Sequence, residues 1–159
     1  MENRITQPDN SCLICDRIAL WRSGQNHYFI YEFAHSIFVV GDHQFHQGYS
    51  LILLKEHIRE LHELTTPVQS ALFQEVMTAG RALVATFQPW KMNYACYANA
   101  EPHIHWHLIP RYAHDPDHHR NPWLHVLEFT KHNIDRETAL AYSKRIREQI
   151  PDVLQKAAV

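Results

Sequence analysis

Hydrophobic and polar residues follow two different periods along this chain. Segments 28–33, 36–40 and 48–54 are short, rich in β-branched and aromatic residues, and separated by turn-prone stretches. These properties predict three consecutive antiparallel strands. Segments 90–97 and 103–109 have the same character and are joined by a short polar turn. The pattern therefore predicts an antiparallel sheet of about five strands.

Between the third and fourth of these segments the period changes to that of a helix. Apolar side chains recur mostly at helical intervals over 68–87, and a threonine at position 65 or 66 stands before Pro67, where a helix cap belongs. A C-terminal helix is predicted from about Asp135 to Gln149, because Ala139, Tyr142 and Ile146 follow Asp135 and Pro151 lies just beyond the end. Strands with separately grouped helices indicate an α+β fold.

Length and composition indicate one domain without a polyanionic or membrane partner. The 159 residues suffice for a single core, and no repeat or linker divides them. The formal net charge of -2 provides no basic field for a nucleic-acid polymer. The longest apolar stretches, such as 51–54, are far too short to span a bilayer, and no signal-like segment follows the first residues. We expect a single domain over residues 1–159 in the cytoplasm.

Three histidines alternate with apolar residues in the run 102–108, at His103, His105 and His107. In a strand, successive side chains point to opposite faces, so the three imidazoles would share one face and the apolar residues the other. In a helix, His105 would lie opposite its two neighbours. The alternation therefore predicts a strand with one polar face and one core face.

Histidine is abundant here, at 14 of 159 residues, so a chance alternation has to be weighed. A shuffled chain of this composition would contain such a triplet roughly 0.1 times. Burying three neutral imidazoles is also costly, because each ring has a donor and an acceptor to satisfy. A functional interpretation is favoured, with the roles of metal ligand, general acid or base, and nucleophile open. Rings spaced along a strand converge poorly on one ion, so phosphoryl chemistry fits them better.

The cysteines suggest one half of a metal site. Three cysteines form no even disulfide framework, and Cys96 stands alone in a strand-like segment, as a small core residue would. Cys12 and Cys15 have the spacing of a tetrahedral knuckle. His57 and one histidine of the triplet would complete four ligands. The alternative is a pair of buried thiols.

Three segments together resemble the histidine triad (HIT) family: 12–18, 48–57 and 103–112. The family signature, three histidines alternating with apolar residues, is matched in full. The resemblance covers roughly residues 11–112 and leaves 113–159 as a C-terminal extension. It implies a HIT-like fold, usually in a homodimer with an extended sheet. It also implies a nucleotide hydrolase or nucleotidyl transferase that forms a nucleotidyl-histidine intermediate.

The resemblance suggests a role for each matching position. His105 would attack the α-phosphorus of a nucleotide, and His107 would hold phosphoryl oxygens and assist the leaving group. Asp42 matches the residue that bonds ribose hydroxyls, and Asn93 and Asn99 resemble polar residues beside the phosphate. In zinc-bearing members, the metal ligands would correspond to Cys12, Cys15, His57 and His103.

The chain also departs from the family pattern. Tyr49 stands where many members carry a histidine, so the fourth active-site histidine of those members is absent, and Leu54 replaces a frequent proline. Segment 97–102 is shorter than the Gly-x-x-x-x-Gln stretch that often precedes the triad. These differences alter the phosphate side of the site, and the sequence assigns neither the base nor the leaving group.

Other functions fit parts of the pattern. A nucleotide-binding module with a structural zinc site and little turnover fits Tyr49 and the shortened loop. A metal-handling protein fits the many histidines and predicts several ions per chain. The stretch 114–119 offers two carboxylates and three imidazoles to a divalent ion, although a solvated loop is the commoner outcome for such residues.

Overall fold

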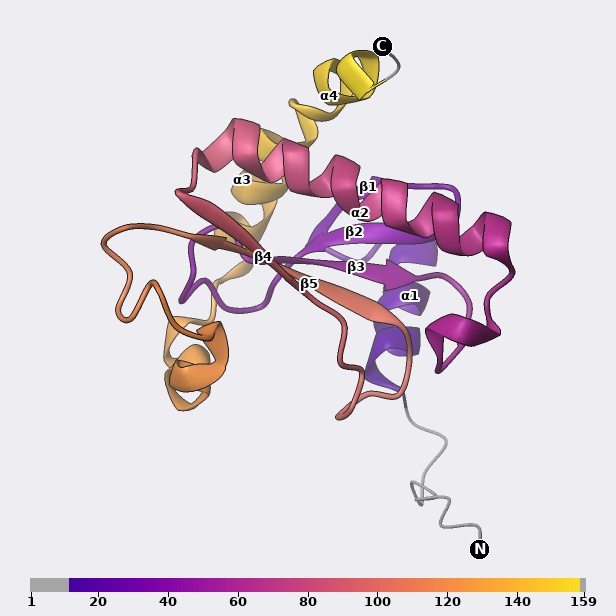
Figure 1. The fold of residues 1–159 in the computed structure, drawn as a ribbon, viewed down its shortest axis with the longest axis horizontal. Helices are drawn as coiled ribbons and strands as arrows, with labels where there is room; N and C mark the ends of the chain where they lie inside the picture. The colour runs from indigo at the N-terminus through magenta and orange to yellow at the C-terminus, as the bar shows by residue number, and fades with distance from the viewer. Residues whose placement is uncertain (1–11, 158–159) are drawn as a thin grey trace, which may run out of the picture.

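A computed structural model describes residues 12–157 of the chain (Figure 1). Its centre is a single antiparallel sheet with the strand order β1-β2-β3-β5-β4. The long helix α2 follows β3 and leads to β4 at the sheet edge, and β5 then returns between β4 and β3. The five strands are β1 (Phe29–Glu32), β2 (Ser36–Val40), β3 (Ser50–Leu54), β4 (Lys91–Ala95) and β5 (His105–Arg111).

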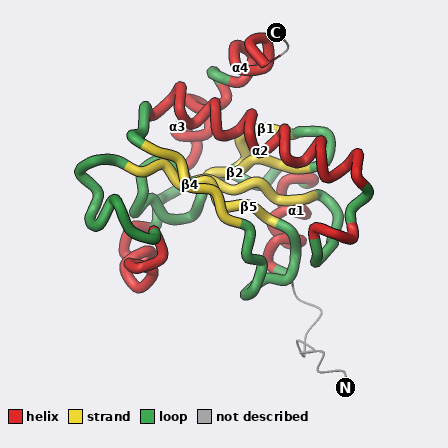
Figure 2. Tube along the Cα trace, in the orientation of Figure 1, coloured by secondary structure: helices red, strands yellow, loops and turns green. Residues whose placement is uncertain are grey.

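Helices cover the two faces of the sheet unequally (Figures 1 and 2). α2 and α3 pack on one face, and α1 packs on the other, against β2 and β3. The α-helices are α1 (Leu13–Arg22), α2 (Thr66–Phe87), α3 (Arg136–Arg147) and α4 (Ile150–Ala157); 3-10 turns occur at η1 (Leu61–Glu63) and η2 (Pro122–His132). Over residues 12–157, no helix is long and apolar enough to cross a membrane.

Alternation along the central strands divides the apolar residues between two cores. Ile37 and Leu53 face α1, whereas Phe38 and Ile52 face α2, and all four are fully buried. In a strand, neighbouring side chains emerge on opposite faces, so one apolar run can serve both layers. The face toward α1 ends at β5, where histidines replace the aliphatic side chains.

The predicted α+β architecture with five antiparallel strands is confirmed. α2 spans Thr66–Phe87, which agrees with the predicted helical segment, and its N-cap is Thr65. Asp135 caps α3 by accepting a hydrogen bond from the backbone N–H of Thr138 at 2.8 Å. Pro151, however, does not end the helical region but lies in the first turn of α4. A first-turn proline is tolerated, because its missing N–H would have had no intrahelical partner there.

Candidate active site and metal centre

β5 and the residues before it place three imidazoles on the face of the sheet opposite α2. His105 and His107 face Leu53 and Leu51 of β3 in the strand register, and His103 precedes the first residue of the strand. The alternate side chains pack into the core beside α2, namely Ile104, Trp106 and Leu108. The alternation therefore has the expected polar and apolar faces, although the regular strand begins two residues later than segment 103–109.

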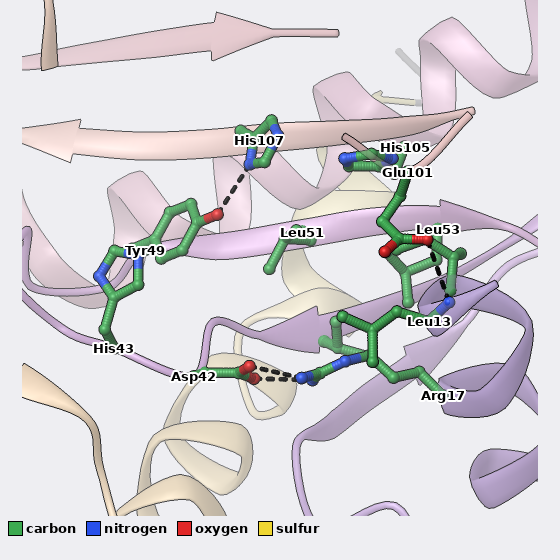
Figure 3. A pocket seen from close by; sticks show the side chains of 12 residues that line it. Leu13, Arg17, Asp42, His43, Tyr49, Leu51, Leu53, Glu101, His105 and His107 are labelled. Carbon is green, nitrogen blue, oxygen red and sulfur yellow. Dashed lines mark hydrogen bonds and ion pairs between the residues drawn. The ribbon is translucent and has the colours of Figure 1, made fainter. Parts of the chain in front are cut away.

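A pocket opens over the two strand imidazoles, between β3 and α1 (Figure 3). His105 and His107 lie at one end, and the Arg17–Asp42 pair lies at the other. Apolar side chains form the wall between the two ends. We call this the histidine pocket; its lining is Leu13, Ile14, Arg17, Val39, Asp42, His43, Tyr49, Leu51, Leu53, Glu101, His105 and His107.

The backbone fixes the tautomer of His105. Its Nδ1 lies 2.7 Å from the carbonyl oxygen of His103, and a carbonyl can only accept, so Nδ1–H is the donor. In the neutral ring, Nε2 then carries a free lone pair. His105 lines the pocket and is only 7% exposed. Burial and the hydrogen bond to the His103 carbonyl together hold its ring in one orientation. Such a ring has the form that a nucleophile requires.

Tyr49 fixes the neighbouring imidazole. Its phenol oxygen lies 2.7 Å from Nδ1 of His107 (Figure 3), and no other acceptor for this hydroxyl is found within residues 12–157. Burial raises the pKa of Tyr49 and lowers that of His107 to about 4, with smaller contributions from neighbouring histidines to the latter. The phenol therefore donates to a neutral ring, which leaves the His107 proton on Nε2. Gly41 permits this placement, because a Cβ there would collide with the Tyr49 ring.

His43 connects the pocket to the C-terminal segment. Its ring is stacked between Tyr49 and Phe129, with centroid distances of 4.6 and 4.3 Å. On the other side of the site, Trp123 meets His107 edge-on at 5.0 Å. η2 thus closes one side of the imidazole pair. Burial lowers the pKa of His43 to about 4, so this ring is neutral near pH 7.

These two low pKa values make the stability of the fold depend on pH. Folded-state pKa values of about 4 lie below the usual 6.5, so the unfolded chain binds more protons between these values. The contribution is complete above pH 6.5 and is lost as the pH falls toward 4. We expect the free energy of unfolding to decrease by a few kcal/mol over this range, since one pKa unit corresponds to about 1.4 kcal/mol.

Denaturant titrations at pH 7, 5.5 and 4.5 measure this dependence. H43F keeps a stacking ring but removes the titrating group. Its free energy of unfolding should therefore change less steeply with pH than that of the wild type. H119F is the matched control, because His119 is exposed on the loop after β5. An H43F slope equal to that of the wild type would contradict the assignment.

Asp42 lies in the pocket, two residues after β2. Its carboxylate accepts hydrogen bonds from two nitrogens of Arg17, Nη1 to Oδ1 at 2.6 Å and Nη2 to Oδ2. The Asp42 side chain is 44% exposed, so both oxygens remain accessible from the pocket. A carboxylate held in this way presents two fixed acceptors at the end of the pocket away from the imidazoles.

The two predicted asparagines do not reach the pocket. Asn93 lies on β4, where its Oδ1 accepts a hydrogen bond from buried Arg111 at 3.4 Å. Asn99 is exposed in the bend between β4 and β5. Neither lines the histidine pocket. The polar group that the 97–102 loop does supply is Glu101, which accepts a hydrogen bond from the backbone N–H of Leu13 at 3.1 Å.

The four predicted metal ligands converge from three parts of the chain. One potential ligand atom from each of Cys12, Cys15, His57 and His103 lies within 4.8 Å of every other. The Nδ1 of His103 is 3.5 Å from the sulfur atoms of Cys12 and Cys15, and the Nδ1 of His57 is 3.3 Å from that of Cys15. Tetrahedral zinc with thiolate and imidazole ligands requires ligand separations of about 3.3–3.8 Å.

The protonation of this cluster is compatible with a cation. Nε2–H of His103 donates to the carbonyl of Leu54 at 2.7 Å, which leaves Nδ1 free as a ligand. Burial, assisted by Cys12, raises the pKa of the Cys15 thiol to about 11. A bound ion would have to displace this proton, as metals do at thiolate sites. The donor set of two sulfurs and two imidazoles fits zinc.

The histidine-rich loop 114–119 has no such convergence. Its carboxylates serve other partners: Asp115 accepts from Arg111 and from the backbone N–H of Tyr112, and Asp117 faces His125. Within the described part of the chain, the Cys12 cluster is the one group arranged for a metal. The loop is therefore a structural turn around Arg111.

Three polar residues of the pocket were not predicted from the sequence: Arg17, His43 and Glu101. Arg17 is 25 positions from its partner Asp42, and the Leu13–Glu101 contact spans 88 positions. The sequence contains one usable signal for Arg17, the CLICDRI segment at 12–18, which contributes to the HIT resemblance and supplies the two cysteines. Its helical spacing also brings Leu13, Ile14 and Arg17 to the pocket.

Comparisons with known proteins agree on one fold. Residues 23–114 match the HIT domain. Among curated proteins, the chain is similar to Protein hit of Bacillus subtilis (strain 168), with 30% identity over 90 residues. The match covers 53% of this chain and 61% of that protein, so it spans about three fifths of the relative's length.

Several solved structures have a similar backbone. A histidine triad protein of Bradyrhizobium japonicum is 22% identical, with a TM-score of 0.67 over 77% of this chain and 89% of that one. A zinc-bound histidine triad family protein of Mycobacterium smegmatis is 22% identical (TM-score 0.63; 92% and 97% covered). Diadenosine triphosphate hydrolase of Plasmodium falciparum is 15% identical (TM-score 0.58; 79% and 78% covered). At these identities the likeness establishes the fold alone.

Proposed function

Because the chain belongs to the HIT domain family, we propose that it is a nucleotide hydrolase or nucleotidyl transferase in which His105 attacks the α-phosphorus. The observation that carries the proposal is the His105 tautomer: Nδ1–H donates to the His103 carbonyl at 2.7 Å, so in the neutral ring Nε2 carries the lone pair, and the ring lines the pocket. The similarity in fold to a diadenosine triphosphate hydrolase supports a nucleoside phosphate substrate.

The reaction has two halves. The Nε2 lone pair of His105 forms a bond to the α-phosphorus, and the bond from phosphorus to the leaving group breaks, with its electron pair departing on that group. The resulting nucleotidyl-imidazolium is stabilised by the Nδ1–H bond to the carbonyl of His103. Water, or an acceptor in a transferase, then attacks phosphorus, and the P–N bond breaks to restore His105.

His107 supplies a proton donor next to this nucleophile. Its ring is neutral, with the proton on Nε2, and lies at a centroid distance of 4.9 Å from the ring of His105. The Nε2–H group would donate to a phosphoryl oxygen or to the leaving group as charge develops there. Tyr49, at the position where many family members carry an additional histidine, would hold this ring through its hydrogen bond to Nδ1.

Removing the Tyr49 hydroxyl tests this assignment. Y49F leaves the ring stacking intact but releases His107 to adopt either neutral tautomer, so we expect kcat to fall about tenfold with a smaller change in KM. Steady-state kinetics on a nucleoside phosphoramidate or a dinucleoside polyphosphate measure the effect. Y31F is the control, since Tyr31 lies on β1, outside the histidine pocket and away from β4. Unchanged kcat in Y49F would exclude a role of the phenol in fixing His107.

We propose zinc as the ion at Cys12, Cys15, His57 and His103. Support comes from the donor set, the separations of 3.3–3.5 Å between sulfur and nitrogen atoms, and the similarity in fold to a zinc-bound histidine triad family protein. The ion would be structural, because four protein ligands leave no open position for substrate. In this assignment the first histidine of the triad holds metal and the other two act on phosphate.

We also propose that the chain forms a homodimer through β4. This strand is at the edge of the sheet and has one unpaired side within residues 12–157. Large apolar side chains are exposed side by side on β4 and on α2, at Tyr94 and Val84 (38% and 45% exposed). An open edge and apolar neighbours favour a strand from a second copy. A molar mass in solution of one 18.8 kDa chain would contradict this arrangement.

The proposed function is tested by trapping the intermediate. The protein is mixed with a nucleoside phosphoramidate, quenched in alkali, which preserves phosphoramidates, and digested for mass spectrometry. A nucleotidyl adduct on the peptide that contains His105 supports the enzyme. Nucleotide binding without an adduct and without turnover would instead support the second candidate, a binding module with a structural metal, for which Tyr49 and the short 97–102 loop are the specific observations.

A further inference from the structure

We propose that Glu101 is a specificity-determining residue that binds the edge of the nucleobase, so that the histidine pocket prefers guanine nucleotides. This inference rests on the proposed function and specifies its substrate. Glu101 belongs to the 97–102 loop before the triad, and its side chain lines the pocket beside His105 (Figure 3). The reaction proposed above gives this carboxylate no role.

The Glu101 carboxylate is held by one wall of the pocket. Oε2 accepts a hydrogen bond from the backbone N–H of Leu13 at 3.1 Å, and the other oxygen is turned away from Leu13, into the pocket (Figure 3). Leu13 is the first residue of α1, where a backbone N–H has no partner within the helix. A carboxylate has about four acceptor sites, and this bond occupies one. The two oxygens therefore present adjacent acceptors in a fixed direction.

The residue that holds the carboxylate also offers an apolar surface. The Leu13 side chain lines the pocket and is 50% exposed. Leu51 and Leu53 of β3 form the facing apolar wall. A flat ring between these walls would bury apolar surface on both of its faces. Because Glu101 is bonded to Leu13, an edge of such a ring would meet the carboxylate.

Glu101 places an uncompensated negative charge in the pocket. Asp42 is paired with Arg17, whereas no ion pair within residues 12–157 joins Glu101 to a lysine, arginine or histidine. A lone carboxylate weakens the binding of any phosphate nearby. Hydrogen-bond donors on the ligand would compensate this charge, and acceptors facing it would be repelled. The carboxylate therefore favours a ligand with donors at this edge.

Guanine fits two adjacent acceptors better than the other common bases do. Its N1–H and its 2-amino group are neighbouring donors that can bond both oxygens of one carboxylate. Adenine and cytosine each place a ring nitrogen that accepts beside their amino group. Uracil has one N–H between two carbonyl oxygens. Each of these three bases would direct an acceptor at the Glu101 carboxylate.

Calorimetric titration of the full-length protein tests the proposal without requiring turnover. The probes are guanosine, inosine and adenosine 5′-monophosphates; inosine lacks only the 2-amino group of guanosine. We expect the wild type to bind the guanine nucleotide at least about tenfold more tightly than either of the others. E101Q keeps an acceptor for the Leu13 N–H but turns a donor toward the ligand. Both affinity ratios should fall below about threefold in this variant.

The control is E137Q, the same substitution in the first turn of α3, where Glu137 is exposed and outside the pocket. It should keep both wild-type ratios. Equal binding of the three nucleotides by the wild type, or a guanine preference retained in E101Q, would overturn the proposal. If E101Q does not fold, as judged by circular dichroism, E101A takes its place, because it also lacks both acceptors and should lose the preference.

Two further outcomes separate this proposal from others. If E101Q binds all three nucleotides more tightly by the same factor, Glu101 acts only through its charge, and the base assignment is overturned. A guanine preference that depends on Glu101, without any adduct on His105, would support the present proposal and overturn the proposed reaction. An adduct on His105 without any base preference in binding would support the reaction and overturn the present proposal.

Discussion

Turnover of a nucleoside phosphoramidate is expected to fall at least about 1,000-fold when His105 is replaced with alanine, while nucleotide binding remains measurable. The substitution removes the Nε2 lone pair on which the covalent step depends, and no other imidazole can take its position. His107 is not a substitute, because its Nδ1 is bonded to Tyr49 and its Nε2 carries a proton. Single-turnover kinetics and calorimetry on the same preparation measure the two quantities.

The matched control for this experiment is H119A, the same chemical change on an exposed loop. It should leave kcat within about twofold of the wild type, as expected for a surface substitution away from the site. The H105A variant should also lack the nucleotidyl adduct. An H105A protein that turns over substrate at the wild-type rate would exclude His105 as the nucleophile.

The second large effect concerns the metal centre. C15A is expected to reduce bound zinc from about one ion per chain to much less than one and to lower the free energy of unfolding by several kcal/mol, because a structural ion contributes its binding energy to folding. Two thiolates and two imidazoles become three ligands, and Cys15 is the sulfur nearest to His57. Elemental analysis and thermal unfolding, with and without a chelator, measure both effects.

Cys96 provides the control for the metal experiment. It is the remaining cysteine, partly buried against the core and outside the cluster. C96A should retain the ion and lose only the contacts of a small side chain, on the order of 1 kcal/mol. If C15A keeps a full complement of zinc, or if the wild type binds none, the assignment of the four ligands is wrong.

Much of the architecture was predictable because periodicity is a local property. The strands at 36–40 and 48–54, the helix at 66–87 and the Asp135 cap each depend on residues a few positions apart. α1 was not predicted, because its buried face is only Ile14 and Ile18 and the segment carries little amphipathic signal. α4 was missed because a proline near a helix was interpreted as a stop signal.

Functional side chains could be predicted where they belong to a short sequence motif. The alternation at 103–107 and the Cys12–Cys15 spacing fix local geometry, and the structure brings His57 and His103 to those cysteines. The pocket depends on distant pairs instead. Local periodicity does not indicate that Arg17 pairs with Asp42. Nor does a tyrosine at position 49, by itself, indicate that its hydroxyl reaches His107.

One helix of ten residues joins the two centres. α1 begins beside Cys12, a proposed ligand, carries Cys15 in its first turn, and in the same turns presents Leu13, Ile14 and Arg17 to the histidine pocket. An ion that anchors the start of this helix therefore also sets one wall of the binding site. Thermodynamic reciprocity then requires that any factor by which metal loading raises the nucleotide affinity also be the factor by which bound nucleotide raises the metal affinity. If zinc is the ion, this linkage predicts that the nucleotide-bound protein retains it at a lower free zinc concentration than the nucleotide-free protein does.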